Sequence, residues 1–331
     1  MPAEWEPHAR CLMCWSAAYE TEEEDELWPI YEEQARLAKA IARFEPVTVL
    51  AHPEDAASAR RFCGPVVQVK AIDLYDLWAR DTLPSFVSDP SGKLRAVTWN
   101  FNAWGNKDNE MTADWTLAKR AAGTLGVTSL VANIIAEGGA IEVDGEGTLL
   151  TTETCLLNPN RNPGISKREI ERELAFLTGA TKVIWLPGST FDTVTDGHID
   201  GIARFVAPGA VLAEVTDDRQ DPEYEELKEN AKVLERATDA KGRKLEVIRI
   251  YRPRWEYIRD KGDDFAATYV NFYIANGGVI MGKYGDPKRD EEARALLAEL
   301  FPARQIVQIR YDEICEGGGG IHCSTQQVPV G

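Results

Sequence analysis

The residues best suited to chemistry are one cysteine, one histidine and three carboxylates: Asp81, Glu137, His198, Asp200 and Cys323. A cysteine thiolate is a strong nucleophile, and four glycines before Cys323 would let another molecule approach its backbone closely. A histidine can accept and return a proton near neutral pH. Paired carboxylates match the rigid fork of donors on a guanidinium. The set therefore suits thiolate attack on the central carbon of a planar cation, with the histidine delivering a proton to the departing amine.

The spacing of these residues is nearly regular. The gaps are 137 − 81 = 56, 198 − 137 = 61 and 323 − 198 = 125, the last being two units of about 62. Each residue comes just before a predicted hairpin, except Cys323, which comes at a predicted strand. Equivalent places in a closed repeat array converge on one axis, so we expect the five residues to form one site. Taken singly, each is equally typical of a turn, a cap or a structural hydrogen bond.

The elements that must position these residues form a repeating unit of hairpin, helix and short strand. The turns contain the Gly, Asn, Asp or Pro that tight hairpins require, and the hairpins are predicted at 85–99, 141–150, 203–212 and 269–281. Apolar periodicity predicts helices near 112–125, 166–177, 222–237 and 287–300. β-Rich runs predict the strands that follow, at 127–131, 182–186, 245–250 and 305–309.

A fifth unit would join the two ends of the chain. A C-terminal strand at 321–327 is predicted to pair with a strand at 11–15, followed by a helix at 27–41 and a strand at 47–50. The acidic run at 20–26 suits the positive N-terminal end of that helix. Because no linker rich in Pro, Gly or Ser interrupts the pattern, we expect an α/β fold and a single domain over 1–331.

The composition indicates which kind of binding partner and which cellular compartment to expect. The 331 residues contain 54 acids and 37 bases, a net charge of −17, which argues against nucleic acid or anionic membrane and favours a small cationic substrate. The sequence has no signal peptide pattern and no apolar run of the ~18 residues that a membrane span needs. We therefore expect six reduced cysteines and a cytoplasmic protein, with the Cys11-x-x-Cys14 pair buried in a strand.

The histidines do not form a metal-ligand motif. There are only four, with no HxH, HExxH or paired CxxC, although a zinc site of Cys323, His198 and Asp200 is an alternative. Successive side chains of a strand point to opposite faces, so a strand at 321–327 would turn His322 away from the face that Cys323 uses. His198 is therefore the expected partner base, and Asp200, two residues on, would share its face.

Eight short stretches from one end of the chain to the other form a recognisable set. They are MPAEWEPH (1–8), WARDT (78–82), FNAWG (101–105), EGG (137–139), LNPNRNP (157–163), TDGHID (195–200), YVNFYIANG (269–277) and IHCSTQQ (321–327). In content and order they resemble the agmatine deiminase and bacterial peptidylarginine deiminase family. The resemblance implies the pentein fold, a five-bladed α/β propeller with pseudo-fivefold repeats around a central active-site channel.

The resemblance also implies a reaction and a role for each residue. Agmatine and water would give N-carbamoylputrescine and ammonia, without metal or organic cofactor. Cys323 matches the nucleophile that forms a covalent thiouronium intermediate, and His198 matches the general acid and base. Asp81 and Asp200 match the carboxylates that bind the guanidinium. Glu137 matches the acid that binds the guanidinium and orients the histidine.

Other positions bear on the substrate. Trp78 matches an aromatic wall of the pocket, and it is also a typical core aromatic. Leu83, Asp196 and Ser324 depart from the family pattern, which has glycine, often asparagine and a larger apolar residue there. Because no clear arginine clamp for an α-carboxylate is evident, agmatine is preferred over arginine.

Other functions on the same scaffold stay open. An arginine deiminase or dihydrolase, a peptidylarginine deiminase, an amidinotransferase and a deiminase of a specialised guanidino metabolite are the alternatives within the superfamily. A non-catalytic pentein that acts as a binding protein is the alternative from another class. By analogy with the family, we also expect a homo-oligomer.

Overall fold

The computed structural model describes residues 1–15, 27–259, 262 and 264–331. The acidic run at 20–26 lies outside these residues. Within them the strands form five sheets, which are not hydrogen-bonded into one. In every sheet a short antiparallel pair is followed by a parallel strand. The predicted repeat of hairpin and returning strand is therefore present.

The first sheet joins the two ends of the chain and has the order β16-β1-β2-β3. Its strands are β1 (His8–Trp15), β2 (Val47–Ala51), β3 (Gln68–Ala71) and β16 (Gln326–Pro329). The other four sheets are three-stranded, with the strands in chain order. They are β4 (Ser85–Ser88), β5 (Leu94–Thr98) and β6 (Thr128–Val131); β7 (Glu142–Val143), β8 (Thr148–Thr152) and β9 (Lys182–Leu186); β10 (Ala203–Ala207), β11 (Ala210–Val215) and β12 (Glu246–Tyr251); β13 (Tyr273–Ala275), β14 (Gly278–Gly282) and β15 (Gln305–Ile309).

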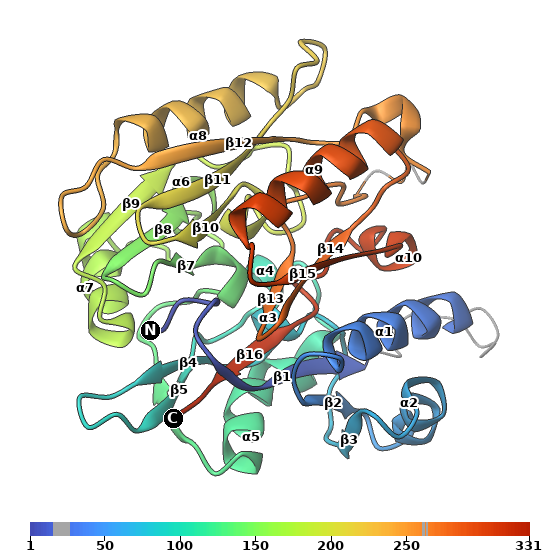
Figure 1. The fold of residues 1–331 in the computed structure, drawn as a ribbon. Coiled ribbons are helices and arrows are strands. Elements are labelled where there is room, and N and C mark those ends of the chain that lie inside the picture. The colour runs from blue at the N-terminus through green and yellow to red at the C-terminus, as the bar shows by residue number, and fades with distance from the viewer. Residues whose placement is uncertain (16–26, 260–261, 263) are drawn as a thin grey trace.

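The longer helices lie around the periphery of the molecule, and the short helices α3 and α4 lie near its centre (Figure 1). The longer helices are α1 (Trp28–Ile41), α2 (Ala56–Cys63), α5 (Leu117–Thr124), α7 (Lys167–Thr178), α8 (Tyr224–Arg236) and α9 (Pro287–Leu300). The short ones are α3 (Ala79–Thr82), α4 (Ala103–Asn106), α6 (Glu153–Leu156), α10 (Asp312–Cys315) and the 3₁₀ turns η2 (Met111–Thr116), η3 (Gly138–Ala140), η4 (Ile199–Gly201) and η5 (Trp255–Tyr257).

Local sequence explains where the helices begin and end. Helix α7 starts at a capping box, in which Ser166 and Glu169 bond each other's backbone, and it stops at Gly179, whose φ of 77° suits glycine. Helix α9 starts at Asp286, whose carboxylate accepts from the backbone of Lys288 and Arg289. The helix predicted at 112–125 is divided into η2 and α5.

The two ends of the chain pair as predicted, but the last strand is shorter than predicted. Strand β16 is antiparallel to β1, with Cys11 opposite Gln327 and Leu12 opposite Gln326, and the two lie side by side in Figure 1. The predicted start at residue 321 is wrong. Residues 321–325 form a turn, closed by bonds from the Ser324 amide to the Gly320 carbonyl (3.2 Å) and from the Thr325 amide to the His322 carbonyl (3.1 Å).

Two further details differ from the sequence-based expectation. Strand β13 begins at Tyr273, so residues 269–272 precede the hairpin and do not belong to it. The first sheet also carries an additional strand, β3, which follows helix α2 and pairs in parallel with β2. Strand β3 was missed because its run is short and only partly apolar, whereas residues 269–272 were assigned to the hairpin because they are mostly aromatic and apolar.

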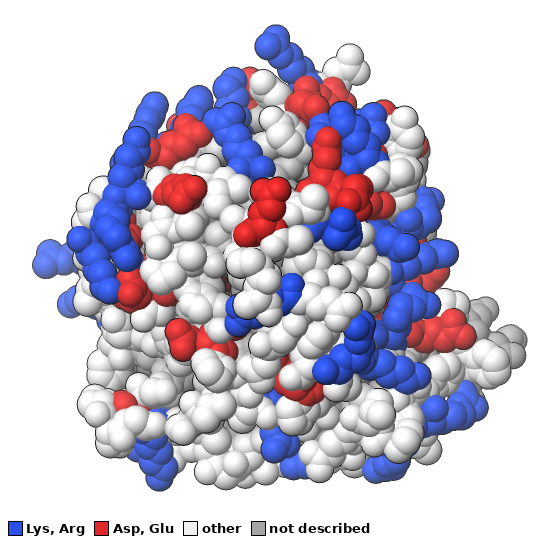
Figure 2. Space-filling model, in the orientation of Figure 1, with Lys and Arg blue, Asp and Glu red and all other residues white. Residues whose placement is uncertain are grey.

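The core consists of several apolar clusters, and the two cysteines of β1 belong to different ones. Cys11 and Cys14 are both buried, as predicted, and all six cysteines are free thiols. None of the helices in the described part of the chain is long and apolar enough to cross a bilayer. Figure 2 shows basic side chains gathered around the rim of one face, interleaved with acidic ones.

Candidate active site

Cys323 lies in the turn that follows the glycine run, and one asparagine holds that turn. The Asn271 side-chain oxygen accepts from the His322 amide at 2.9 Å, and its nitrogen lies 3.2 Å from the Cys323 sulfur. A Cβ added to Gly320 would stand 2.6 Å from that oxygen, so glycine is required for this close approach. The thiol is therefore fixed by the loop before β13, which the sequence reasoning treated as part of a strand.

His198 lies between two carboxylates at the start of η4. Its Nε2 is 3.4 Å from Glu137 Oε2, and Glu137 directly precedes η3. Its Nδ1 is 3.9 Å from Asp81 Oδ2 and has no hydrogen-bond partner among the described residues. The predicted contact between Glu137 and the histidine is present, and the second ring nitrogen is left free for proton transfer.

Three functional groups converge beside Gly139. Its amide donates to Asp81 Oδ1 at 2.9 Å. A Cβ built on Gly139 would lie 2.6 Å from His198 Nδ1, 3.0 Å from Asp81 Oδ1 and 3.2 Å from Asp200 Oδ2. Gly139 therefore packs directly against groups from two other segments of the chain, α3 and η4.

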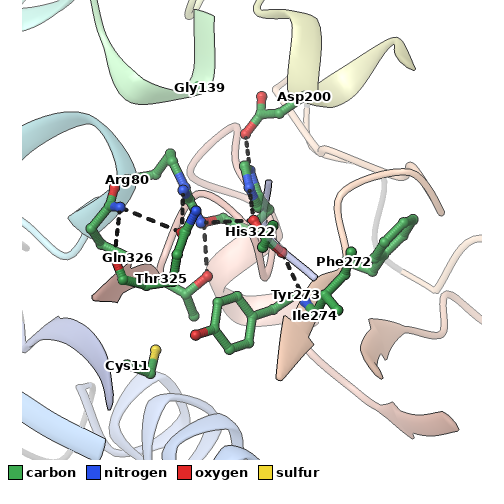
Figure 3. Close-up of polar contacts among 12 residues, drawn as sticks. Cys11, Arg80, Gly139, Asp200, Phe272, Tyr273, Ile274, His322, Thr325 and Gln326 are labelled. Atoms are coloured by element: carbon green, nitrogen blue, oxygen red, sulfur yellow. Dashed lines mark hydrogen bonds and ion pairs between the residues drawn. The ribbon is translucent and has the colours of Figure 1, made fainter. Parts of the chain in front are cut away.

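Asp200 connects the thiol to a second histidine. Its Oδ2 lies 3.6 Å from the Cys323 sulfur and 2.7 Å from His322 Nδ1, a contact that Figure 3 shows. The other ring nitrogen of His322 lies 2.8 Å from Glu4 Oε2. Glu4 in turn pairs with Arg80 and Arg204, at 3.3 and 3.0 Å.

The prediction that His322 points away from the face used by Cys323 is therefore wrong. Because residues 321–325 form a turn, alternation between faces does not apply, and the ring of His322 bonds the same Asp200 that faces Cys323. His198 and Asp200 do line one cavity, as expected, but a 3₁₀ turn brings them together and no strand is involved.

Arg161 is a site residue that the sequence reasoning missed. Its side chain is fully buried, and its Nε donates to Glu137 Oε1 at 2.8 Å. Its Nη1 contacts Asp196, and its Nη2 donates to the Thr195 carbonyl at 3.0 Å. Asp196, one of the departures from the family pattern, thus pairs with the arginine that orients Glu137. The signal lay in the quoted LNPNRNP and TDGHID stretches, which the structure brings together.

Burial and charge set the protonation of the site. Burial opposes ionisation of Asp200 and Glu137, but His322 and His198, respectively, outweigh it, so both pKa values are lowered. Burial would lower the pKa of His198, yet Asp81 and its other partners raise it well above its usual value. Burial and the charge of Asp200 raise the pKa of the Cys323 thiol well above its usual value. The resting site thus holds a thiol and an imidazolium.

A cavity of about 180 Å³ leads to the thiol. Its inner lining includes His198, Asp200, Asn271 and Cys323. Asp81 and Glu137 lie deeper, behind His198, and are not among the described lining residues. The site therefore consists of residues that line the cavity and of two carboxylates, Asp81 and Glu137, that contact His198 from outside it.

The remaining predicted positions lie around this cavity and do not line it. Trp78 packs against the glycine run: a Cβ on Gly319 would be 2.3 Å from its ring. Leu83 is buried in an apolar cluster, and the Ser324 hydroxyl donates to the Gly320 carbonyl at 3.0 Å. Neither Leu83 nor Ser324 is among the lining residues of the described chain.

One group of metal-ligand types is present, and it differs from the predicted alternative. Ligand atoms of Glu137, Cys155 and His198 lie within 4.8 Å of one another. The Arg161 guanidinium is 2.8 Å from Glu137 and places a positive charge beside this group. That charge disfavours a divalent cation there.

Comparison with known proteins agrees with this geometry. The agmatine deiminase of Stutzerimonas stutzeri (strain A1501) is 43% identical over 352 residues, covering 100% of this chain and 95% of that protein. The solved structure of the Enterococcus faecalis agmatine deiminase superposes with a TM-score of 0.94 at 36% identity, covering 99% of this chain and 95% of that one. A C. jejuni agmatine deiminase with substrate bound matches with a TM-score of 0.89 at 26% identity, over 100% and 96%.

The family profile described as Porphyromonas-type peptidyl-arginine deiminase matches residues 1–329. Nearly the whole chain is covered, including every residue of the site described above. The chain therefore belongs to the Porphyromonas-type peptidyl-arginine deiminase family, and it is a guanidine-modifying hydrolase with an α/β fold.

Proposed function

We propose that the protein is an agmatine deiminase that converts agmatine and water into N-carbamoylputrescine and ammonia. The observation that carries this proposal is the cavity that His198, Asp200 and Cys323 line together, with the Cys323 sulfur 3.6 Å from Asp200. A guanidinium placed in that cavity would meet a carboxylate, a thiol and a proton donor at once. The names of the similar proteins supply the substrate.

The first half of the reaction forms a covalent intermediate. The Cys323 proton leaves to solvent as the substrate cation binds, and the thiolate attacks the guanidinium carbon to form a C–S bond. His198 gives a proton to one terminal nitrogen, the C–N bond breaks, and ammonia departs. Cys323 then carries an amidino thioether.

The second half restores the enzyme. Water gives one proton to His198 as its oxygen attacks the amidino carbon. The C–S bond then breaks, and the remaining proton of that oxygen passes to the departing Cys323 sulfur, which releases the carbamoyl product and restores the thiol and the imidazolium. Asp200, on the cavity wall, holds the guanidinium nitrogens throughout. The family pattern gives Asp81 the same role, and its Oδ2 lies 3.9 Å from His198 Nδ1. Glu137 keeps the histidine ring in position through Nε2.

The charges in the cavity support agmatine over arginine. Among the described residues that line the cavity, Arg252 is the one arginine, and there is no lysine. Arg252 is already paired with Glu214, Asp221 and Glu223, at 2.9, 3.2 and 3.1 Å. A substrate α-carboxylate would find no free guanidinium there, whereas a second amine would meet acids.

The same proposal includes the architecture and setting. We infer that the five sheets are the blades of a pentein propeller, that the chain is one catalytic domain over 1–331, and that its ligand is a small guanidino cation. Six free thiols suit a reducing compartment such as the cytoplasm. The pairing of β16 with β1 supports a fold whose ends close within one blade.

The test is ammonia release from agmatine, arginine and a blocked arginyl peptide, each measured beside a Cys323→Ala variant. Release from agmatine alone, abolished in the variant, is the expected result. Turnover of arginine or peptide in place of agmatine would retain the mechanism and overturn the substrate. Release from none of the three would contradict the proposed function.

A further inference from the structure

The indole N–H of Trp104 donates to Asp81, one of the carboxylates of the site. Trp104 Nε1 lies 3.0 Å from Asp81 Oδ2, and both side chains are buried. The other carboxylate oxygen, Oδ1, accepts from the Gly139 amide at 2.9 Å. Each oxygen of Asp81 is therefore held by a neutral donor.

Asp81 lies close to His198 without bonding it. Asp81 Oδ2 is 3.9 Å from His198 Nδ1, which has no hydrogen-bond partner among the described residues. A protonated imidazole and a carboxylate in direct contact form a charge-assisted hydrogen bond of about 2.7–2.9 Å. The carboxylate therefore stops about 1 Å short of a bond that the two charges favour.

The backbone that carries Trp104 has an unfavourable conformation. In and beside α4, four residues other than glycine have positive φ, namely 58° at Asn100, 53° at Ala103, 50° at Trp104 and 62° at Asn106. Such a conformation is rare for a bulky side chain, and it persists only where surrounding contacts enforce it. Asn102 enforces it here, because its side chain accepts from the Gly105 amide at 2.9 Å and donates to the Asn160 carbonyl at 3.0 Å.

A purely structural role does not account for this arrangement. A buried indole N–H needs an acceptor, but a hydroxyl can serve, as Ser85 does for Trp99 at 3.0 Å. The chain instead takes a strained turn that directs the indole of Trp104 at a carboxylate beside His198. Burial raises the pKa of Asp81 against the opposing charge of His198, and the Trp104 hydrogen bond also favours the ionised form.

We propose that Trp104 is a positioning residue that holds Asp81 Oδ2 away from His198 and so keeps His198 Nδ1 free for proton transfer. In the first half of the reaction the Nδ1–H bond breaks and its proton joins the departing nitrogen. In the second half, water returns a proton to Nδ1. Without the indole donor, Oδ2 would turn to the imidazolium, occupy Nδ1 and retain its proton. This inference rests on the proposed deiminase function and adds a residue that acts through Asp81.

The charges around the two groups give the direction of the expected pH effect. The groups that face His198 come from four segments of the chain and are Asp81, Glu137, Cys155 and Asp200. Asp81 is faced by His198, by the same Glu137 and Asp200, and by Cys323. Loss of the indole N–H removes one donor from Asp81 and leaves the other groups in place. The carboxylate should then bind the imidazolium, which would lose its proton at a higher pH.

The experiment compares the wild type with Trp104→Phe and with the control Trp185→Phe. Phenylalanine keeps an aromatic ring at each position and removes the N–H. Trp185 Nε1 also donates to a carboxylate, Glu171 Oε1 at 2.9 Å, between β9 and the peripheral helix α7. Ammonia release from agmatine gives kcat and KM as a function of pH, and thermal midpoints confirm that each variant is folded.

We expect Trp104→Phe to lower kcat about tenfold or more, as part of the roughly 100-fold or more that general acid–base catalysis contributes. KM should change little, because the thiol and Asp200 are untouched. The alkaline limb of the pH profile of kcat, where the imidazolium loses its proton, should move to higher pH. Trp185→Phe should match the wild type in kcat and in its pH profile.

Two results with a folded Trp104→Phe protein would overturn the inference while leaving the deiminase function intact. One is a kcat equal to that of the wild type. The other is a lower kcat with the alkaline limb at the pH of the wild type or below it, as a structural role predicts. A wild type that is inactive on agmatine would instead refute the deiminase function.

A measurement on the wild type decides the matter if Trp104→Phe does not fold. Protein labelled with ¹⁵N-histidine contains four labelled rings, and the spectrum of His198→Asn identifies the signals of His198. We expect a His198 Nδ1 proton that exchanges rapidly with water, since none of the described residues accepts it. A slowly exchanging Nδ1 proton, hydrogen-bonded to Asp81, would overturn the inference.

Discussion

Replacement of Arg161 with methionine should be among the most destabilising single changes near the site. The side chain is fully buried, and it pairs with Glu137 at 2.8 Å and with Asp196, while donating to the Thr195 carbonyl at 3.0 Å. Methionine fills a similar volume but removes the counter-ion that Glu137 and Asp196 share, which leaves Glu137 with His198 and Asp196 with Lys107. Breaking a buried pair in this way costs about 3–5 kcal/mol.

That loss is large enough to measure by unfolding. At roughly 2–4 °C per kcal/mol, Arg161→Met should lower Tm by about 6–20 °C. It should also lower the urea midpoint with an unchanged slope. The matched control is Arg249→Met, since Arg249 pairs with Glu235 at 2.6 Å on the surface. The control should change stability by less than about 1 kcal/mol.

A second substitution separates the loss of charge pairing from the loss of packing. Glu137→Gln, combined with Arg161→Met, removes the fully buried carboxylate charge that loses Arg161. The double variant should therefore be less destabilised than the sum of the single changes, by about 0.5–3 kcal/mol. If Arg161→Met is as stable as the control, or if the two changes add, the account of Arg161 as a buried counter-ion is refuted.

Three further outcomes follow from the site. Gly139→Ala should reduce kcat by about 100-fold, because its Cβ would lie 2.6 Å from the His198 ring. The control Gly123→Ala has open space around the added Cβ and should leave kcat unchanged. Equal effects of the two substitutions would contradict this prediction. Without substrate, alkylation of Cys323 by neutral iodoacetamide should keep accelerating above pH 9, since burial and Asp200 raise the thiol pKa; a plateau near pH 7 would contradict it. His322→Asn should lower kcat/KM about tenfold or more. It should also move the acid limb of the pH profile of kcat/KM to higher pH, because the carboxylate of Asp200 would lose the partner that lowers its pKa against burial. An acid limb at the same pH as in the wild type would contradict this prediction.

Much of the site could be predicted because its residues occupy equivalent places in a repeat. Asp81, Glu137, His198 and Cys323 each precede a hairpin or strand of their own sheet, and that shared phase brings them together. Asn271 has the same relation to β13 and was missed only because the preceding residues looked like strand.

What could not be predicted depends on contacts between units. Arg161 acts by spanning two loops, from Glu137 to Asp196, and no periodicity marks such a bridge. His322 was assigned to the wrong face because local alternation suggested a strand, whereas the glycine run closes a turn there. Local sequence patterns therefore find the residues, and only tertiary structure shows which carboxylate each histidine contacts.

The most direct test of the central claim is to trap the covalent intermediate on Cys323. The protein is mixed with agmatine, quenched in acid and measured by intact mass and peptide mapping, beside Cys323→Ala. We expect an adduct equal to the substrate less one ammonia, located on Cys323 and absent from the variant. Ammonia release without any adduct, or an adduct on another cysteine such as Cys155, would contradict it.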